Sequence, residues 1–227
     1  MRQRRAKNLE EKVEALASYQ VENPQKFFGR WQEFFGNQNP IYLEIGCGKG
    51  QFALRQALAH PNRNYIAVEG QISVALRAME KAALAEQQTG RRNLVIICAF
   101  VNDIGELFQE GELAGIYLNF SDPWPKDRHY KRRLTYRSRL MSYMKALMPE
   151  GFIEIKTDND NLFAFTQEEA DSCSFLPVAC VADLYGDTAS SGSTAVFLKE
   201  AIEITTEYED KFRSQGLPIH YMRLEKK

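Results

Sequence analysis

Residues 41–50 read Ile-Tyr-Leu-Glu-Ile-Gly-Cys-Gly-Lys-Gly, a short apolar run followed by three glycines at alternate positions. The apolar run is typical of a buried strand, and glycines directly after a strand bring bare backbone to the carboxyl edge of a sheet, where ligands bind in α/β proteins. The spacing differs from the Gly-x-Gly-x-x-Gly loop of dinucleotide-binding proteins, because the third glycine comes one residue early and Gln51 follows it. The stretch predicts a ligand-binding loop of an α/β protein, with a simple tight turn as the alternative.

Strand and helix patterns alternate at short spacing beyond this loop. The predicted strands are Ile41–Ile45, Tyr65–Val68, Leu94–Cys98, Ile116–Phe120, Phe152–Lys156, Leu176–Ala182 and Ile219–Leu224. The predicted helices run from the glycine loop to Ala59 and over Ile72–Gln88, Asp103–Phe108, Leu134–Leu147, Leu162–Cys173 and Thr206–Ser214. This alternation predicts an α/β fold with a mostly parallel seven-stranded sheet and helices on both faces.

The first 38 residues precede this pattern. Residues 7–20 carry apolar side chains at helical spacing. An aromatic cluster follows before Asn39-Pro40, made of Phe27, Phe28, Trp31, Phe34 and Phe35. We expect residues 1–38 to be a helical and aromatic extension packed on the core, and residues 39–227 to be the main domain.

Composition excludes several classes of protein. With 227 residues and 44% hydrophobic residues, the chain can bury a core and is not wholly disordered. No apolar run approaches the about 18 residues that span a bilayer, and no apolar segment of a secretory signal follows the basic N-terminus. The four cysteines lack the spacing of zinc ligands. Two of them, Cys47 and Cys98, lie in or beside predicted core strands. We expect a soluble cytoplasmic protein without a membrane segment, a metal site or structural disulfides.

The net charge of −1 hides a strong asymmetry. Residues 126–139 hold seven Lys or Arg residues against one acid, a local charge of +6, and residues 1–12 carry +3. The remainder of the chain is therefore acidic, at −10. An acidic body with two basic segments predicts a directed contact with a polyanion, and the alternative is a solvated helix face.

Two carboxylates flank the glycine loop. Glu44 lies just before it, where an acid suits a ligand with a positive centre, such as the sulfonium and ammonium groups of S-adenosylmethionine, better than a pyrophosphate. Glu69 ends the second strand 25 residues later, where a carboxylate can accept both ribose hydroxyls of an adenosine. Together with Gly46 and Gly48, these acids predict a site for S-adenosylmethionine. We expect Asn102, after the third strand, to meet the adenine edge, and the alternative role for Asn102 is a helix N-cap.

The segment Tyr117-Leu-Asn-Phe-Ser-Asp-Pro-Trp-Pro-Lys126 carries a second signal. Both prolines fix φ and lack an N–H donor, so the loop cannot continue the sheet and holds one acid and one indole rigidly at its edge. An acid beside a flat aromatic ring can bind a nucleobase, because the ring stacks on the base and the carboxylate accepts its N–H groups. The basic run that follows can bind phosphates. We therefore predict a nucleic-acid partner, while the role of His129 stays open among base contact, phosphate contact and solvation.

These motifs resemble those of the bacterial tRNA (guanine-N7-)-methyltransferase family. The resemblance runs from about Ile41 to the C-terminus and is carried by Gly46–Gly50, Phe120–Lys126, Arg128-His129, Lys131–Tyr136, Lys156–Asn159 and Thr206–Glu209. It implies a Rossmann-like methyltransferase fold for the main domain, S-adenosylmethionine as donor, and tRNA as substrate with N7 of guanine 46 in the variable loop as acceptor.

The resemblance also implies roles for single residues. Glu44, Glu69 and Asp122 fall on cofactor-contacting positions, and Asp122 is also the catalytic position. The implied substrate contacts are Lys126, Asp158, Thr206, Glu207, Tyr208 and Glu209, and the RNA contacts of the basic run are Arg128, His129, Lys131, Arg132 and Arg133. One departure is Phe100, which stands where many relatives carry an Asp after the third strand.

Methyl transfer to guanine N7 needs no proton to leave, because N7 offers an in-plane lone pair. The enzyme must align the reacting atoms and stabilise the positive charge that arrives on the base, and Asp122 and Asp158 are the candidates for that stabilisation. Structural alternatives are a helix N-cap for Asp158 and a capping box for Thr206 with Glu209. The alternative functions are a nicotinamide-dependent oxidoreductase, an exocyclic-amine nucleic-acid methyltransferase and a non-catalytic RNA-binding module. No pattern indicates an oligomeric state.

Overall fold

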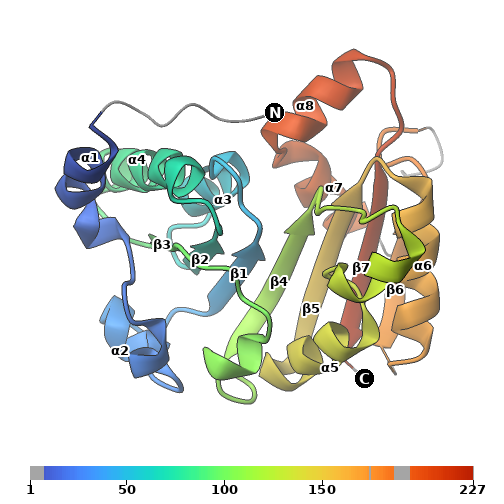
Figure 1. Ribbon diagram of the computed structural model, residues 1–227, viewed down its shortest axis with the longest axis horizontal. Helices are drawn as coiled ribbons and strands as arrows, with labels where there is room; N and C mark the ends of the chain where they lie inside the picture. Colours follow the sequence, from blue (N-terminus) through green and yellow to red (C-terminus); the bar gives the residue numbers. More distant parts are fainter. Residues whose placement is uncertain (1–7, 174, 187–194, 227) are drawn as a thin grey trace. The chain divides into compact units, whose positions relative to one another are not determined.

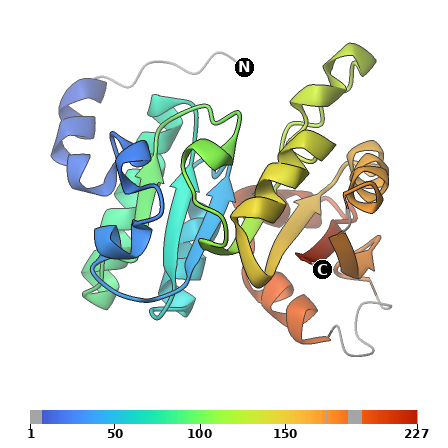
Figure 2. The same ribbon diagram turned by 90° about the horizontal axis from the view of Figure 1, so that it is seen from below.

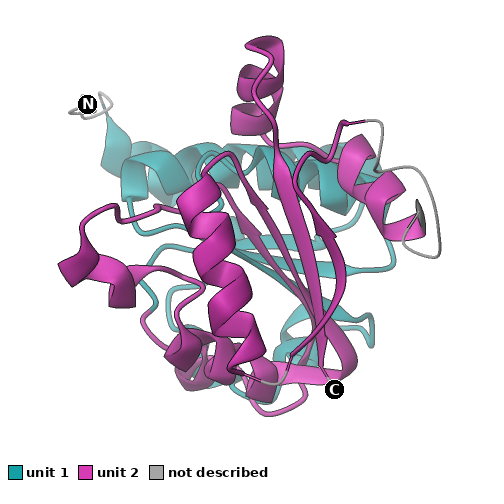
Figure 3. Cartoon of the chain, turned by 90° about the vertical axis from the view of Figure 1, so that its right-hand side faces the viewer, with its two compact units in different colours: residues 1–101 teal, residues 102–227 magenta. Residues whose placement is uncertain are grey.

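The computed structural model describes residues 8–173, 175–186 and 195–226, which form seven strands and eight α-helices (Figure 1). The chain divides into two compact units, residues 1–101 and residues 102–227 (Figure 3). In each unit the candidate ligand residues follow the carboxyl ends of strands, so the strands of each unit are described first.

The first unit is built on three parallel strands. β1 (Ile41–Ile45), β2 (Asn64–Val68) and β3 (Leu94–Ile97) are arranged in the order β3-β2-β1. Every residue of these strands is buried, as expected for parallel strands covered on both faces. Helices α3 (Gln51–Ala59) and α4 (Ile72–Thr89) connect the strands and pack against each other.

The N-terminal segment packs on this unit. It contains α1 (Leu9–Ala15), the short 3₁₀ turns Ala17–Tyr19 and Pro24–Phe27, and α2 (Trp31–Phe35). The Trp31 ring is fully buried and contacts Phe27 and Phe34, and Phe35 contacts Phe34, so the predicted aromatic cluster is confirmed except for Phe28, whose side chain is 45% exposed. The Val21 N–H donates to the β3 carbonyl of Ile96 at 2.8 Å. The domain boundary at residue 38 stays a prediction.

The second unit holds four strands in the order β4-β5-β7-β6. These are β4 (Leu113–Asn119), β5 (Leu147–Thr157), β6 (Phe175–Val181) and β7 (His220–Lys226). β4 and β5 are parallel, whereas β7 runs antiparallel to both β5 and β6. Three parallel pairings against two antiparallel ones confirm the mostly parallel character that the sequence predicts.

The helices of the second unit are α5 (Arg137–Ala146), α6 (Asp160–Asp171), α7 (Ala195–Glu203) and α8 (Glu207–Ser214), with 3₁₀ turns at Ile104–Glu106 and Asp127–Arg132. Helix α6 packs against β5, β6 and β7 (Figure 2). Between the last two predicted strands the sequence predicts one helix, Thr206–Ser214, and this was wrong because the structure also has α7 there. The predicted start of α5 at Leu134 was also wrong: Thr135 is buried and accepts a hydrogen bond from Thr166 of α6 at 2.8 Å, which holds this segment outside the helix.

All four cysteines are free thiols, with Cys47 buried and Cys98 half-buried. Within the described ranges, no helix is both long and apolar enough to cross a membrane. The same residues contain no group of three or more His, Cys, Asp or Glu side chains placed to hold a metal ion.

Candidate functional site

The glycine loop of the first unit has the backbone conformation that only glycine adopts readily. Gly46, Gly48 and Gly50 have φ values of +79°, +56° and +74°. A Cβ on Gly46 or Gly48 would meet no atom within 4 Å, so their bare backbone is open to a ligand. Gly50 differs, because a Cβ there would lie 2.8 Å from the Ala78 Cβ, and this glycine allows α3 to pack closely on α4.

Glu69 is bonded to the glycine loop. The Gly48 N–H donates to Glu69 Oε2 at 3.1 Å, and the Gln71 N–H donates to Glu69 Oε1 at 2.9 Å. Hydrogen bonds of this kind to a carboxylate are charge-assisted and hold both partners in one geometry. The carboxylate therefore joins the loop after β1 to the start of α4.

The first unit also has a negative potential at this edge. Glu44 is buried in β1, three residues before the buried Cys47. Burial raises the pKa of the Cys47 thiol well above its usual value, and the charges of Glu44 and Glu69 raise it further. Two carboxylates beside open glycine backbone fit a nucleoside that carries a positive centre, as S-adenosylmethionine does.

Phe100 is an exposed aromatic residue next to these acids. Its side chain is 80% exposed, and a Cβ on Gly70 would lie 2.3 Å from the ring, so the ring rests directly on the backbone after Glu69. Sequence reasoning treated Phe100 only as a departure from the relatives. Its exposure offers an apolar ring face at the edge where the predicted adenosine would lie.

Asn102 belongs to the second unit and does not cap the following turn. The cap is Asp103, whose Oδ1 accepts from the Gly105 N–H at 2.8 Å, so the capping alternative for Asn102 is wrong. The Asn102 carbonyl accepts from Arg139 at 2.8 Å. Its contact with adenine stays a prediction.

In the second unit, two exposed acids follow neighbouring parallel strands. β4 and β5 are in register at Asn119 and Lys156, and the Phe120 N–H donates to the Lys156 carbonyl at 2.8 Å. Asp122 comes two residues after Phe120, and Asp158 comes two residues after Lys156. Because the strands are parallel, both carboxylates stand at the same edge of the sheet.

The capping alternative for Asp158 is wrong. The N-cap of α6 is Asn159, whose side chain accepts from the Leu162 N–H at 2.8 Å. Neither Asp158 nor Asp122 forms a hydrogen bond or ion pair with another described residue, and both side chains are exposed. Both acids are therefore available to a ligand.

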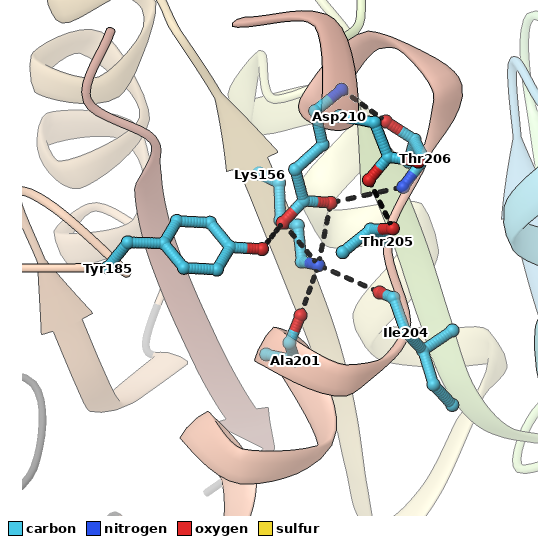
Figure 4. A network of polar contacts seen from close by, with 8 residues as sticks. Lys156, Tyr185, Ala201, Ile204, Thr205, Thr206 and Asp210 are labelled. Atoms are coloured by element: carbon cyan, nitrogen blue, oxygen red, sulfur yellow. Dashed lines mark hydrogen bonds and ion pairs between the residues drawn. The ribbon is translucent and has the colours of Figure 1, made fainter. Parts of the chain in front are cut away.

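A buried ion pair links β5 to α8 (Figure 4). Lys156 Nζ donates to both carboxylate oxygens of Glu209 at 3.0 Å, and the two side chains are only 2% and 0% exposed. The ammonium also donates to the carbonyls of Ala201 at 2.5 Å and Ile204 at 3.0 Å, at the end of α7. The Tyr185 hydroxyl donates to Glu209 at 2.6 Å. Burial lowers the pKa of Lys156, and the charge of Glu209 opposes this shift.

The capping box of α8 is confirmed. Thr206 Oγ1 accepts from the Glu209 N–H at 2.9 Å, and the Glu209 carboxylate accepts from the Thr206 N–H at 3.1 Å. The carboxylate of Glu209 therefore points into the ion pair with Lys156, away from solvent. Within this motif, Glu207 and Tyr208 are the exposed side chains.

Tyr208 lies among aromatic rings. Its ring stacks against Phe120 with centroids 6.4 Å apart, and it lies 6.3 Å from Phe212. The side chain is 59% exposed, so its outer face is open to a planar ligand. The stack also joins α8 to the start of the loop that carries Asp122.

Three residues of the basic run contact the loop that carries Trp124. The Arg132 guanidinium lies 5.0 Å from the centre of the Trp124 ring, and the His129 ring meets Trp124 edge-on at 5.8 Å. Arg133 donates to the carbonyls of Pro123 at 2.9 Å and Trp124 at 3.4 Å. One face of the predicted base-stacking indole is thus covered by Arg132.

The other basic residues differ in whether they form an ion pair with an acid. Arg137 forms an ion pair with Glu169 at 2.8 Å. Lys126, Arg128 and Lys131 are exposed and form no ion pair with a described residue. Only some of the basic residues predicted to bind a polyanion are therefore exposed and without an ion pair to a described residue.

A mostly parallel α/β sheet with open glycine backbone beside carboxylates at the carboxyl end of its first strand fits the Rossmann-like methyltransferase class. A family model described as "Putative methyltransferase" matches residues 38–222. Among solved structures, an antibiotic-related methyltransferase is similar with a TM-score of 0.60 at 16% identity, over 87% of this chain and 92% of that chain. The 16S rRNA methyltransferase KamB has a TM-score of 0.59 at 10% identity, over the same shares. These likenesses confirm the fold.

Relatives of higher identity narrow the class. A tRNA (guanine-N(7)-)-methyltransferase of Lactococcus lactis subsp. cremoris strain MG1363 is 42% identical over 227 residues, covering 100% of this chain and 98% of the relative. The enzyme of the same name from Listeria innocua is 42% identical over 217 residues, or 96% and 94% of the two chains. The Brevibacillus brevis enzyme is 39% identical over 218 residues, or 95% of both. The chain belongs to the tRNA (guanine-N(7)-)-methyltransferase family.

Proposed function

We propose that this protein transfers the methyl group of S-adenosylmethionine to N7 of guanine 46 in the variable loop of tRNA. The observation that carries the proposal is the pair of exposed acids, Asp122 and Asp158, after two parallel neighbouring strands. Preorganised carboxylates stabilise the positive charge that develops on the base as its N7 is methylated. Family membership gives the reaction class.

The cofactor site of the proposal lies in the first unit. Glu69 accepts the ribose hydroxyls, Glu44 attracts the positive end of the cofactor, and the open backbone of Gly46 and Gly48 allows close approach. The exposed ring of Phe100 stacks on adenine. When bound, S-adenosylmethionine supplies an electrophilic methyl group on a sulfonium. The predicted cofactor contacts of Asn102 and Asp122 remain part of the proposal.

The acceptor site of the proposal lies in the second unit. Asp122 and Asp158 accept N–H groups of the guanine, and their charge favours the methylated, cationic base over the neutral one. Tyr208 offers an open aromatic face for stacking. Thr206 and Glu209 act indirectly, since they hold α8 through the capping box and the buried ion pair.

The exposed cations Lys126, Arg128 and Lys131 bind phosphates of the tRNA in this proposal. With tRNA as the substrate, the protein works in the cytoplasm. Residues 1–38 serve as an extension of the methyltransferase domain.

The test is the identity of the product. Purified protein, unmodified tRNA and isotopically labelled S-adenosylmethionine are incubated, and the methylated nucleoside is identified by mass spectrometry after digestion. We expect 7-methylguanosine. Methylation of an exocyclic amine would favour the alternative methyltransferase, and tRNA binding without any methylated nucleoside would favour a non-catalytic RNA-binding module.

A further inference from the structure

The loop Asp122-Pro-Trp-Pro125 cannot support itself. Neither proline has an N–H to donate, and Trp124 has a φ of +43°, a left-handed conformation that is unfavourable for a bulky side chain. Such a conformation persists only where surrounding groups hold it. The backbone around Trp124 therefore depends on contacts from other parts of the chain.

Arg133 makes such contacts. Its Nε donates to the Pro123 carbonyl at 2.9 Å, and its Nη2 makes a longer contact of 3.4 Å with the Trp124 carbonyl. The same guanidinium lies 4.3 Å from the centre of the Phe165 ring on α6. A planar guanidinium can bond two carbonyls on its edge while its face stacks on a ring, and lysine cannot do both.

The backbone around Arg133 is itself anchored. Two residues later, Thr135 is fully buried and bonded to Thr166 of α6 at 2.8 Å. On the other side, Lys131 is exposed and lies 5.8 Å from the centre of the neighbouring Tyr130 ring. Residues two apart in the basic run therefore face different surroundings: Lys131 faces solvent and Arg133 faces the loop.

We propose that Arg133 is a positioning residue that holds the Asp122–Trp124 loop against α6, and that it is not a phosphate contact. Asp122 lies in the loop after β4 and directly precedes Pro123, so the bond from the Arg133 guanidinium to the Pro123 carbonyl restrains the backbone that carries the Asp122 carboxylate. The inference rests on the proposed function, in which this carboxylate meets the guanine.

The experiment compares Arg133→Ala and Arg133→Lys with Lys131→Ala in the full chain. For each protein we measure the single-turnover methylation rate at saturating tRNA, the salt dependence of tRNA affinity, and acrylamide quenching of tryptophan fluorescence. Trp31 is fully buried, so quenching reports mainly on the half-buried Trp124.

For Lys131→Ala we expect weaker tRNA binding, a plot of log affinity against log salt that is shallower by about 0.7–0.9, and recovery of the rate at saturating tRNA. For both Arg133 variants we expect an unchanged slope, stronger quenching, and a saturated rate that is lower by about 10- to 100-fold. Arg133→Lys keeps the charge, so it separates loss of geometry from loss of charge.

The inference is overturned if Arg133→Ala behaves like Lys131→Ala while Arg133→Lys behaves like the unmodified protein, because a phosphate contact requires only the charge. It is also overturned if neither rate nor quenching changes in the lysine variant. Should Arg133→Ala not fold, the lysine variant alone decides between these outcomes. Failure of the proposed function is distinguishable, since the unmodified protein would then form no 7-methylguanosine.

Discussion

In the first unit a carboxylate holds a backbone loop, whereas in the second unit a carboxylate is itself held by side chains from distant parts of the chain. Glu69 accepts hydrogen bonds from the backbone of Gly48 and Gln71, and its side chain is half-buried. Glu209 is completely buried and is bonded by Lys156, 53 residues away, and by Tyr185. Glu69 thus joins two neighbouring backbone segments, whereas Glu209 joins side chains of distant parts of the chain.

This difference gives the two edges different sensitivities. Substitution of Glu69 removes a few hydrogen bonds and the ligand contact proposed for it. A buried acid cannot lose its partner without leaving an uncompensated charge in the core. We therefore expect substitution of Glu69 to change cofactor binding, and substitution of Lys156 or Glu209 to change the stability of the fold.

The largest expected effect is that of Lys156→Met. It leaves the Glu209 carboxylate buried without its ammonium partner, which we expect to lower the free energy of unfolding by about 3–5 kcal/mol. Urea unfolding measures this. The matched control is Lys199→Met, which removes an exposed lysine 4.0 Å from Glu203 and should change stability by at most about 0.5 kcal/mol. Equal effects of the two variants would contradict the comparison.

The next largest effect is expected for Asp122, at the proposed acceptor site. Asp122→Asn keeps the shape of the side chain and removes the charge, so we expect turnover to fall by about 100-fold and tRNA affinity to change much less. Steady-state kinetics with a separate binding titration measures both. Asp127→Asn, an exposed acid five residues away, is the control and should keep normal turnover. A normal turnover number for Asp122→Asn would reduce Asp122 to a structural residue of the loop.

In the first unit, Glu69→Ala removes the proposed acceptor of the ribose hydroxyls and the hydrogen bond from the Gly48 N–H. We expect the binding free energy of S-adenosylmethionine to weaken by about 1–3 kcal/mol, with normal stability of the fold. Calorimetric titration measures the affinity, and Glu80→Ala, from the exposed pair with Arg77 on α4, is the control. Unchanged affinity would remove Glu69 from the cofactor site.

A smaller effect is expected for Phe100→Ala, which removes the exposed ring on Gly70. Loss of an aromatic face beside adenine should weaken binding of S-adenosylhomocysteine by about 1 kcal/mol. The same calorimetric titration measures it, and Phe100→Trp should restore the affinity. If the alanine and tryptophan variants bind equally well, Phe100 does not stack on the cofactor.

The smallest effect depends on pH. Hydrogen bonds from the Arg137 side chain and backbone N–H lower the pKa of Glu169 below its ordinary value near 4.5. The folded state thus favours the charged form, so this contribution to stability is complete above about pH 4.5 and is lost as the pH falls through the lower pKa of the folded protein. The melting temperatures of the unmodified protein and Glu169→Gln should converge between pH 7 and pH 3. A constant difference would show that the ionised carboxylate contributes nothing.

The same comparison explains how much the sequence could predict. In the first unit, β1 was predicted with its observed bounds, Ile41–Ile45, because strand, glycines and helix follow one another locally. The acids beside the loop were found for the same reason. The alternating pattern likewise predicted the other strands of the described residues within three positions at each end, except β5, which starts at Leu147 and not at the predicted Phe152.

In the second unit, local pattern was insufficient. Lys156 and Glu209 lie far apart in the sequence, and nothing near either residue indicates its partner. Helix α7 follows a segment rich in Gly, Ser and Thr, although buried residues at a spacing of three, Leu198, Ala201 and Ile204, were a usable signal. The basic run reads as uniform charge, and only packing separates Arg133, which bonds the loop, from Lys131, which faces solvent.

We propose that the acceptor site around Asp122 and Asp158 directs the methyl group to N7 of guanine 46. Methylation at N7 makes a tRNA strand sensitive to reduction followed by aniline cleavage, whereas methylation of an exocyclic amine does not. Treating methylated tRNA in this way and sizing the fragments therefore reports both atom and position. We predict one new cleavage, at guanine 46, that is absent when adenine replaces this guanine. Methyl incorporation without cleavage, or cleavage only at other positions, would contradict methylation of N7 of guanine 46.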